Sequence, residues 1–300
     1  MDKRKLYGVV CALVCPMHAD GSVDFEGVRR LTRHLVDSGI HCLYPNGTNG
    51  ESLSLTAAER QKIAQTIHEE NSERAVLYVQ CGAGTVKESY EHVRASAALG
   101  VDGAGLMTPV FFPMDDAAMA LYFDEILNEV TDFPLYAYNI PTRSGNDLAP
   151  KMLGALMERH PNLLGVKYSY PDVLRLERYA DCCRSRRASV LVGNDSLATA
   201  CMMAGGDGWV SGPAAVFPKR HVRLYEALKA GRFEEAAKWQ VRIRRTADSM
   251  ADIPEIPAIK YMLMQMGVVG CDFCRPPFRP LTAEEKSRLD AILNEVENED

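Results

Sequence analysis

Short apolar stretches of strand length alternate along this chain with longer segments of helical periodicity. In the first helical segment, Phe25, Val28, Leu31 and Leu35 recur at intervals of three or four residues, which is typical of one buried helix face. The stretches that we interpret as strands are 7–14, 40–44, 76–81, 103–107, 134–138, 163–167, 189–193 and 208–211. The predicted helices span 24–37, a segment that opens at Thr56, 85–99, 117–130, 148–159, 173–184, 197–204 and 218–229.

This alternation predicts a parallel sheet, because parallel strands need long crossover connections and helices supply them. Eight such units within the first 230 residues fit a closed (β/α)₈ barrel, a TIM barrel, better than an open doubly wound sheet. The open sheet is the alternative. It would require a glycine-rich phosphate-binding turn after the first strand, where residues 15–18 read Cys-Pro-Met-His.

The last part of the chain has a different pattern. Helical spacing covers 233–250, 257–266 and 282–296, with a proline-rich joint before the last of these segments. We therefore expect residues 1–230 to form the barrel. Residues 231–300 are expected to form a C-terminal helical extension that packs on it.

Composition limits the possible functions. The 300 residues are 47% apolar with a formal net charge of −6, so there is no basic excess to attract nucleic acid. No apolar run approaches the ~20 residues that span a bilayer. The apolar run 6–15 leads into a proline and a polar turn, so we interpret it as a strand and not a signal peptide. The nine cysteines are scattered, which favours reduced thiols in a cytoplasmic protein.

The sixth apolar stretch contains a lysine, Lys167, near its end. A lysine in this position either reaches solvent or pairs with a carboxylate, or it serves as a nucleophile. Burial of the charged form is costly, so a desolvated amine at the mouth of a barrel can attack a carbonyl and form a Schiff base.

Two other strand ends carry polar residues, and barrel active sites lie at the carboxyl ends of the strands. Thr48 and Asn49 stand between two glycines, where backbone and side-chain donors could bind a small anion or simply form a turn. Tyr138 is either a buried phenol or a proton donor. Arg143, seven residues before Pro150, is either a surface charge or a ligand for a substrate carboxylate.

Three patterns occur in a fixed order: Gly-Thr-x-Gly-Glu at 47–51, Tyr-Asn-x-Pro at 138–141 with Gly145, and Gly-x-Lys at 165–167. Together they resemble the family of dihydrodipicolinate synthase and N-acetylneuraminate lyase. The resemblance extends over nearly the whole chain, including segments 12–17 and 205–212. It implies a (β/α)₈ barrel, usually a homotetramer built as a dimer of dimers.

The resemblance also implies roles for single residues. Lys167 would form a Schiff base with pyruvate or another 2-keto acid, Tyr138 would shuttle protons, and Thr48 would contact the keto acid. The substrate-binding candidates are Gly47, Asn49, Arg143, Ser169 and Val210, with Asn194 as a further candidate for specificity. This chemistry needs no cofactor and no metal.

The chain departs from the family pattern in ways that keep the function open. Phe111 stands where many members have a tyrosine that reaches across a dimer and completes the proton relay, and Asn49 replaces a hydroxyl residue. Arg143 is typical of the synthases, whereas the segment after Lys167 is closer to the lyases. The first hypothesis is a class I keto-acid lyase or aldolase. The alternatives are a dihydrodipicolinate synthase, which condenses pyruvate with aspartate semialdehyde, and a non-catalytic protein that binds a keto acid.

Metal-dependent chemistry is a remote alternative. It needs clusters of His or carboxylate residues at strand ends, and the seven histidines show no such pairing. Cys271 and Cys274 have metal-binding or redox spacing, but no second Cys or His pair lies near them in the sequence.

Overall fold

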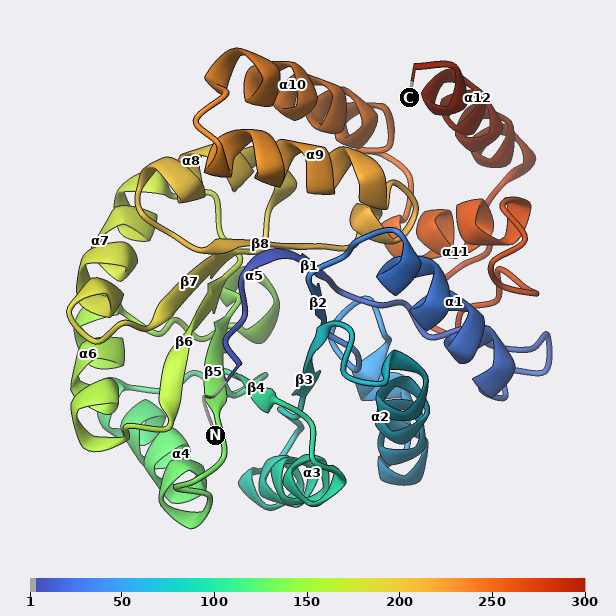
Figure 1. The fold of residues 1–300 in the computed structure, drawn as a ribbon. Helices are drawn as coiled ribbons and strands as arrows, with labels where there is room; N and C mark the ends of the chain where they lie inside the picture. Colours follow the sequence, from blue (N-terminus) through green and yellow to red (C-terminus); the bar gives the residue numbers. More distant parts are fainter. Residues whose placement is uncertain (1–3, 300) are drawn as a thin grey trace. The chain divides into compact units, whose positions relative to one another are not determined.

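The computed structural model describes residues 4–299, and its strands form a closed parallel barrel in the order β1 to β8 (Figure 1). The predicted TIM barrel is therefore confirmed. The strands are β1 Gly8–Cys11, β2 Cys42–Leu43, β3 Val76–Gln80, β4 Gly103–Met107, β5 Leu135–Asn139, β6 Leu163–Tyr168, β7 Ser189–Val192 and β8 Gly208–Ser211.

Helices follow the strands along the chain, as the periodicity predicted. They are α1 Phe25–Asp37, α2 Ala57–Asn71, α3 Val86–Leu99, α4 Asp116–Glu129, α5 Pro141–Ser144, α6 Pro150–Arg159, α7 Val173–Arg184, α8 Ala198–Met203, α9 Pro218–Lys229, α10 Phe233–Ser249, α11 Glu255–Gln265 and α12 Ala283–Glu299. Short 3₁₀ turns are η1 Ser52–Ser54, η2 Asp195–Leu197 and η3 Pro213–Ala215. The short helix α5 was not among the predicted helices.

Local sequence signals explain several helix starts. The Thr56 side chain accepts a hydrogen bond from the Glu59 backbone, and the Glu59 carboxylate accepts one from the Thr56 backbone, which makes a capping box. Thr282 and Glu285 make the same reciprocal pair before α12. Each pair satisfies backbone donors that a helix start leaves unpaired.

The described chain divides into two compact units. The first comprises residues up to Val10, residues 42–44 and Val76–Val210, and it holds most of the barrel strands together with α3 to α8. Its barrel interior is filled by aromatic rings. Tyr78 and Tyr136 meet edge to face with ring centroids 5.1 Å apart, and their hydroxyls bond to backbone groups of Arg4 and Leu6.

The second unit comprises Cys11–His41, Pro45–Ala75 and the chain from Ser211 onward, and it contains α1, α2 and α9 to α12. Its interior holds an ion pair between Lys260 and Glu51, whose side chains are both fully buried. The proposed boundary at residue 230 stays a prediction. Among the described residues, no helix combines the length and the apolar character needed to cross a membrane.

Candidate active site

Lys167 lies near the end of β6, and its side chain is buried. The residue is only 6% exposed. Strand register places it between Tyr138 of β5 and Leu191 of β7. Within the described residues, no carboxylate lies at ion-pair distance from its ammonium group, so Lys167 neither extends into solvent nor forms a salt bridge.

Two tyrosine rings take the place of a carboxylate. The Lys167 Nζ atom lies 3.8 Å from the centroid of the Tyr138 ring and 5.0 Å from that of Tyr44. The two rings stand nearly perpendicular, at 87°, with their centroids 6.4 Å apart. We call Tyr44, Tyr138 and Lys167 the lysine–tyrosine cluster. The structure thus brings two of the three predicted catalytic residues together and adds Tyr44, which the sequence interpretation missed.

Two glycines make room for this cluster. A Cβ atom at Gly105 would lie 1.7 Å from the Tyr44 hydroxyl oxygen, so only glycine at this position of β4 permits the observed ring. A Cβ atom at Gly193, after β7, would lie 1.9 Å from the Ser169 Oγ atom and 3.3 Å from the Lys167 Cε atom. Ser169, a predicted substrate-binding residue, therefore lies beside Lys167. The signal that could have revealed Tyr44 was its place at the end of the second strand.

The segment after β5 is held by Asn139, the second residue of the Tyr-Asn motif. Its buried amide donates hydrogen bonds to the Asp147 carboxylate, the Leu148 carbonyl and the Tyr179 hydroxyl. Arg143 lies on α5 within this segment and is exposed. Its guanidinium has no ion-pair partner in the described part of the chain, so it remains available to an incoming acid.

The loop after β2 carries the other predicted anion-binding residues and belongs to the second unit. Gly47 and Asn49 are buried, and Thr48 is half-buried. The Asn49 amide lies 3.5 Å from a carboxylate oxygen of Glu255, to which it donates. Asn46 and Glu51 flank the loop with left-handed backbone (φ of 58° and 56°), which makes a tight, defined turn.

Three further predicted residues have clear positions. Val210 is buried in β8. The Asn194 side chain accepts a hydrogen bond from the Ser196 backbone and so caps η2. Phe111 is 84% exposed on the segment after β4 and has a left-handed backbone. A phenyl ring has no proton to transfer, so this position contributes no relay.

Metal ligands do not gather in the part of the chain that the structure describes: no group of three or more His, Cys, Asp or Glu side chains could hold an ion there. Cys274 has its thiol directed at the Asp272 carbonyl, and burial raises its pKa to about 12. This thiol therefore stays protonated near neutral pH.

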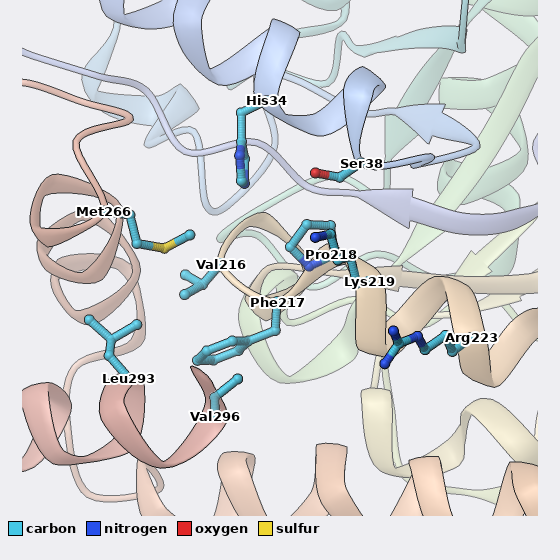
Figure 2. A pocket seen from close by; sticks show the side chains of 10 residues that line it. All are labelled: His34, Ser38, Val216, Phe217, Pro218, Lys219, Arg223, Met266, Leu293 and Val296. Atoms are coloured by element: carbon cyan, nitrogen blue, oxygen red, sulfur yellow. The ribbon is translucent and has the colours of Figure 1, made fainter. Parts of the chain in front are cut away.

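A cavity of about 480 Å³ lies within the second unit (Figure 2). It is lined by His34, Ser38, Val216, Phe217, Pro218, Lys219, Arg223, Met266, Leu293 and Val296. The His34 imidazole is engaged with the Ala215 carbonyl at 3.1 Å, and the Arg223 guanidinium stacks on Trp239. None of the predicted catalytic residues lines this cavity.

Comparison with known proteins identifies the family of this chain. The sequence model of the Dihydrodipicolinate synthetase family matches residues 5–296. The chain belongs to this family. Its curated relatives include an uncharacterized DapA-like lyase of Halobacterium salinarum, 32% identical over 98% of this chain and 95% of that protein. A 4-hydroxy-tetrahydrodipicolinate synthase of Methanococcus maripaludis is 28% identical over 97% of this chain and 99% of the other.

A solved structure supports the same assignment. YagE, a prophage protein of Escherichia coli K12 that belongs to the dihydrodipicolinic acid synthase family, was determined in complex with pyruvate. It superposes with a TM-score of 0.92 at 25% identity, covering 97% of this chain and 99% of its own. The protein is accordingly a lyase of the family, and the resemblance found in the sequence motifs is confirmed.

Proposed function

We propose that this protein is a class I lyase or aldolase that binds pyruvate or a related 2-keto acid as a Schiff base on Lys167. The observation that carries the proposal is the position of the Lys167 side chain. Lys167 is buried at the carboxyl end of a barrel strand, against the ring of the motif tyrosine Tyr138. The pyruvate complex of YagE supports the choice of ligand.

The proposed chemistry follows from these groups. The neutral Lys167 amine adds to the C2 carbonyl carbon, a proton reaches the carbonyl oxygen, and water leaves to give an iminium ion. Tyr138 supplies and takes up protons at this oxygen, assisted by the Thr48 hydroxyl. The iminium then accepts the electron pair released when a carbon–carbon bond breaks or C3 loses a proton, which gives an enamine.

The remaining residues would orient the substrates. Gly47 and Asn49 would bind the keto-acid carboxylate through backbone and amide donors. Arg143, Ser169 and Val210 would contact the variable part of the second substrate or of the cleaved acid. All of these groups are protein side chains and backbone, so the proposal includes no cofactor.

The second substrate separates two forms of the proposal. In the first, the enzyme cleaves a 2-keto-3-deoxy sugar acid or a related acid to pyruvate and an aldehyde. In the second, it condenses pyruvate with aspartate semialdehyde. The second form is favoured by the relatives named as synthases and by the exposed Arg143 guanidinium. Phe111 in place of a relay tyrosine favours the first, and also keeps a non-catalytic keto-acid-binding protein as a third possibility.

Borohydride reduction tests the shared step. Wild-type protein treated with pyruvate and borohydride should gain the mass of one reduced pyruvate adduct, and peptide mapping should place it on Lys167. Lys167→Ala should gain none. An adduct that persists in Lys167→Ala would remove the mechanism.

Two assays then distinguish the forms. Pyruvate release from a panel of 2-keto-3-deoxy sugar acids and sialic acid identifies a lyase, and condensation of pyruvate with aspartate semialdehyde identifies a synthase. A protein that forms the adduct but exchanges no C3 protons of pyruvate with solvent would be the non-catalytic binder.

We further propose that the protein works in the cytoplasm as a homotetramer, a dimer of dimers, in keeping with its reduced cysteines and its family.

A further inference from the structure

The mechanism above leaves one buried titratable side chain of the lysine–tyrosine cluster unused. Tyr44 is 1% exposed, the centroid of its ring lies 5.0 Å from the Lys167 Nζ atom, and its ring plane is nearly perpendicular to that of Tyr138. Among the described residues, no group lies within hydrogen-bond distance of its hydroxyl. Because Gly105 leaves space for this hydroxyl, the ring has a defined position next to the reacting nitrogen.

We propose that the ring of Tyr44 is a positioning residue for the Schiff base, holding Lys167 against Tyr138 and stabilising the positive charge of the iminium nitrogen. This inference rests on the proposed function. The condensation converts a primary amine, a carbonyl and one proton into an iminium cation and water, so the charge sits on the former Nζ atom. In the described residues no carboxylate is near enough to balance that charge, and the faces of two aromatic rings are.

The two tyrosines would have different roles: Tyr44 would act through its ring and Tyr138 through its hydroxyl. Burial, and to a smaller extent the neighbouring Tyr138 phenol, raise the pKa of Tyr44 well above its usual value. The Tyr44 hydroxyl is therefore a poor proton carrier near neutral pH, whereas its ring is well placed. Proton transfer stays with Tyr138.

Two substitutions at residue 44 separate ring from hydroxyl. Tyr44→Phe keeps the ring and removes the hydroxyl, and Tyr44→Leu removes the ring. The measurement is the pyruvate concentration that gives half-maximal borohydride trapping, together with kcat on the preferred substrate. We expect Tyr44→Phe to stay within about twofold of wild type and Tyr44→Leu to need about 3- to 30-fold more pyruvate. If Tyr44→Leu does not fold, Tyr44→Met provides a longer and more flexible apolar side chain for the same comparison.

A matched control uses the other perpendicular ring pair of the barrel. Tyr78→Phe and Tyr78→Leu make the same chemical changes beside Tyr136, and they should lower stability without changing the half-saturating pyruvate concentration of the folded fraction. Equal weakening in Tyr44→Phe and Tyr44→Leu would overturn the inference in favour of the hydroxyl. Wild-type behaviour of Tyr44→Leu or Tyr44→Met would show that the ring is not needed.

The outcomes also separate this inference from the function on which it rests. A wild-type protein that traps no pyruvate would overturn the proposed function and the role of Tyr44 with it. A wild-type protein that traps pyruvate, with residue-44 variants that trap it equally well, would overturn the role of Tyr44 alone.

Discussion

A buried amine at the end of a strand needs partners that hold it in one place, and the partners of Lys167 are aromatic. Parallel strands set Lys167 and Tyr138 side by side in register, so their contact is fixed by the sheet and not by a flexible loop. Tyr44 closes the second side of the amine. Lys167 is thus packed against two aromatic rings, and an amine held in a fixed position is what rapid attack on a carbonyl carbon requires.

The hydroxyl of Tyr138 should be needed for turnover and not for folding. Tyr138→Phe keeps the ring against Lys167 but removes the group proposed to move protons. Its kcat should fall by about 10²- to 10⁴-fold, while thermal unfolding stays near that of wild type. Tyr136→Phe, two residues earlier in β5, removes a hydroxyl that accepts a hydrogen bond from Leu6 and serves as the control. Unchanged turnover in Tyr138→Phe would assign proton transfer to another group.

A side chain at Gly193 should lower catalytic efficiency more than it lowers stability. An alanine Cβ would collide with the Ser169 Oγ atom, which can rotate away, and would press on the Lys167 Cε atom. We expect Gly193→Ala to lower kcat/KM by about tenfold or more with a small change in unfolding free energy. Steady-state kinetics across the substrate panel checks this. Gly84→Ala, whose Cβ would meet only the Glu88 carboxylate at 3.8 Å, should leave the kinetics unchanged.

Sequence motifs pointed to Lys167 and Tyr138, which the structure brings together, and missed the residues packed around them. Lys167 and Tyr138 stand out because a lysine and a tyrosine near strand ends need an explanation. Tyr44 also ends a predicted strand, but a strand buried on both faces is apolar along its length, so nothing in the sequence indicated that this ring points toward Lys167. The contacts in the folded chain show that Tyr44 and Gly193 lie next to Lys167.

At the scale of elements, α11 contacts the loop that follows β2 from within the second unit. Lys260 of α11 donates to the Glu51 carboxylate and to the Phe273 carbonyl, and Glu255 of the same helix accepts from Asn49. The Arg275 backbone donates to the other Glu51 oxygen. A loop with two left-handed residues is thus fixed in part by an ion pair, Lys260 with Glu51, whose two side chains are fully buried.

Removing one member of this buried pair should be strongly destabilising. Lys260→Met leaves the Glu51 carboxylate buried without a cation, and we expect it to lower the free energy of unfolding by about 3–5 kcal/mol. Urea unfolding measures this. The double variant Lys260→Met with Glu51→Gln should recover part of the loss, because the uncompensated charge is gone.

An exposed ion pair provides the control. Lys87 and Glu91 lie 4.0 Å apart on the surface of α3, so Lys87→Met should leave the unfolding curve almost unchanged. A loss in Lys260→Met as small as that in Lys87→Met would mean that the buried pair contributes little to the fold.

The helix α9 contains a histidine that should make stability depend on pH. Burial, and then the neighbouring Arg220, lower the pKa of His221 to about 3 in the folded protein. The unfolded chain binds a proton at this residue near pH 6.5, so the unfolded state gains protons first as the pH falls. Stability should therefore be highest above pH 6.5. It should decline toward pH 3, by up to about 1.4 kcal/mol per pH unit from this group.

The interval between pH 6 and pH 5 tests this effect, because most carboxylates remain ionised there. Burial also lowers the pKa of His34 and His41, and these two residues contribute equally to wild type and to a His221 variant. His221→Asn should show a shallower decline of unfolding free energy than wild type over this interval. His68→Asn, on the partly exposed surface of α2, should follow the wild-type slope. A wild-type slope in His221→Asn would show that another group dominates the pH dependence.

Element prediction succeeded where periodicity or a cap gave a clear signal. The predicted helix 233–250 is observed as Phe233–Ser249, and the helix predicted at 282–296 is observed as Ala283–Glu299. The short elements were harder. The strand expected at 40–44 is only Cys42–Leu43, and α5 has four residues, too few to show a period. Its start is set by Pro141 and its end by Gly145, signals that also occur in ordinary turns.

For the whole molecule, the eightfold alternation was sufficient to predict the fold, since eight parallel strands without a linker close most simply into a barrel. The same reasoning could not supply the second substrate. In the proposed function, selectivity depends on side chains such as Arg143 and Ser169, and their effect on a substrate is set by small differences in position that no spacing in the sequence records.

An exposed apolar patch on the first unit bears on how copies of the chain assemble. Phe111, Phe112, Met114 and Leu121 are large apolar side chains that are 84%, 65%, 37% and 59% exposed. Phe112, Met114 and Leu121 line one cavity of about 360 Å³ in the first unit. The segment is rigidly held, since the Asn146 amide donates to the carbonyls of Pro109 and Phe112. An exposed apolar patch on a segment fixed by hydrogen bonds is typical of a surface that another protein covers.

We therefore expect this patch to be buried in an interface between copies of the chain in the proposed tetramer. Phe112→Asp combined with Leu121→Asp places two charges in the patch and should lower the mass of the assembly, measured by sedimentation equilibrium at micromolar concentration. Val241→Asp, which adds a charge at a partly exposed apolar position of α10, should keep the wild-type mass. If wild type is already monomeric at these concentrations, the patch does not join copies of this chain. If the double variant keeps the wild-type mass, the copies meet through another surface, because two buried carboxylates facing an apolar patch would cost more than the contact could return.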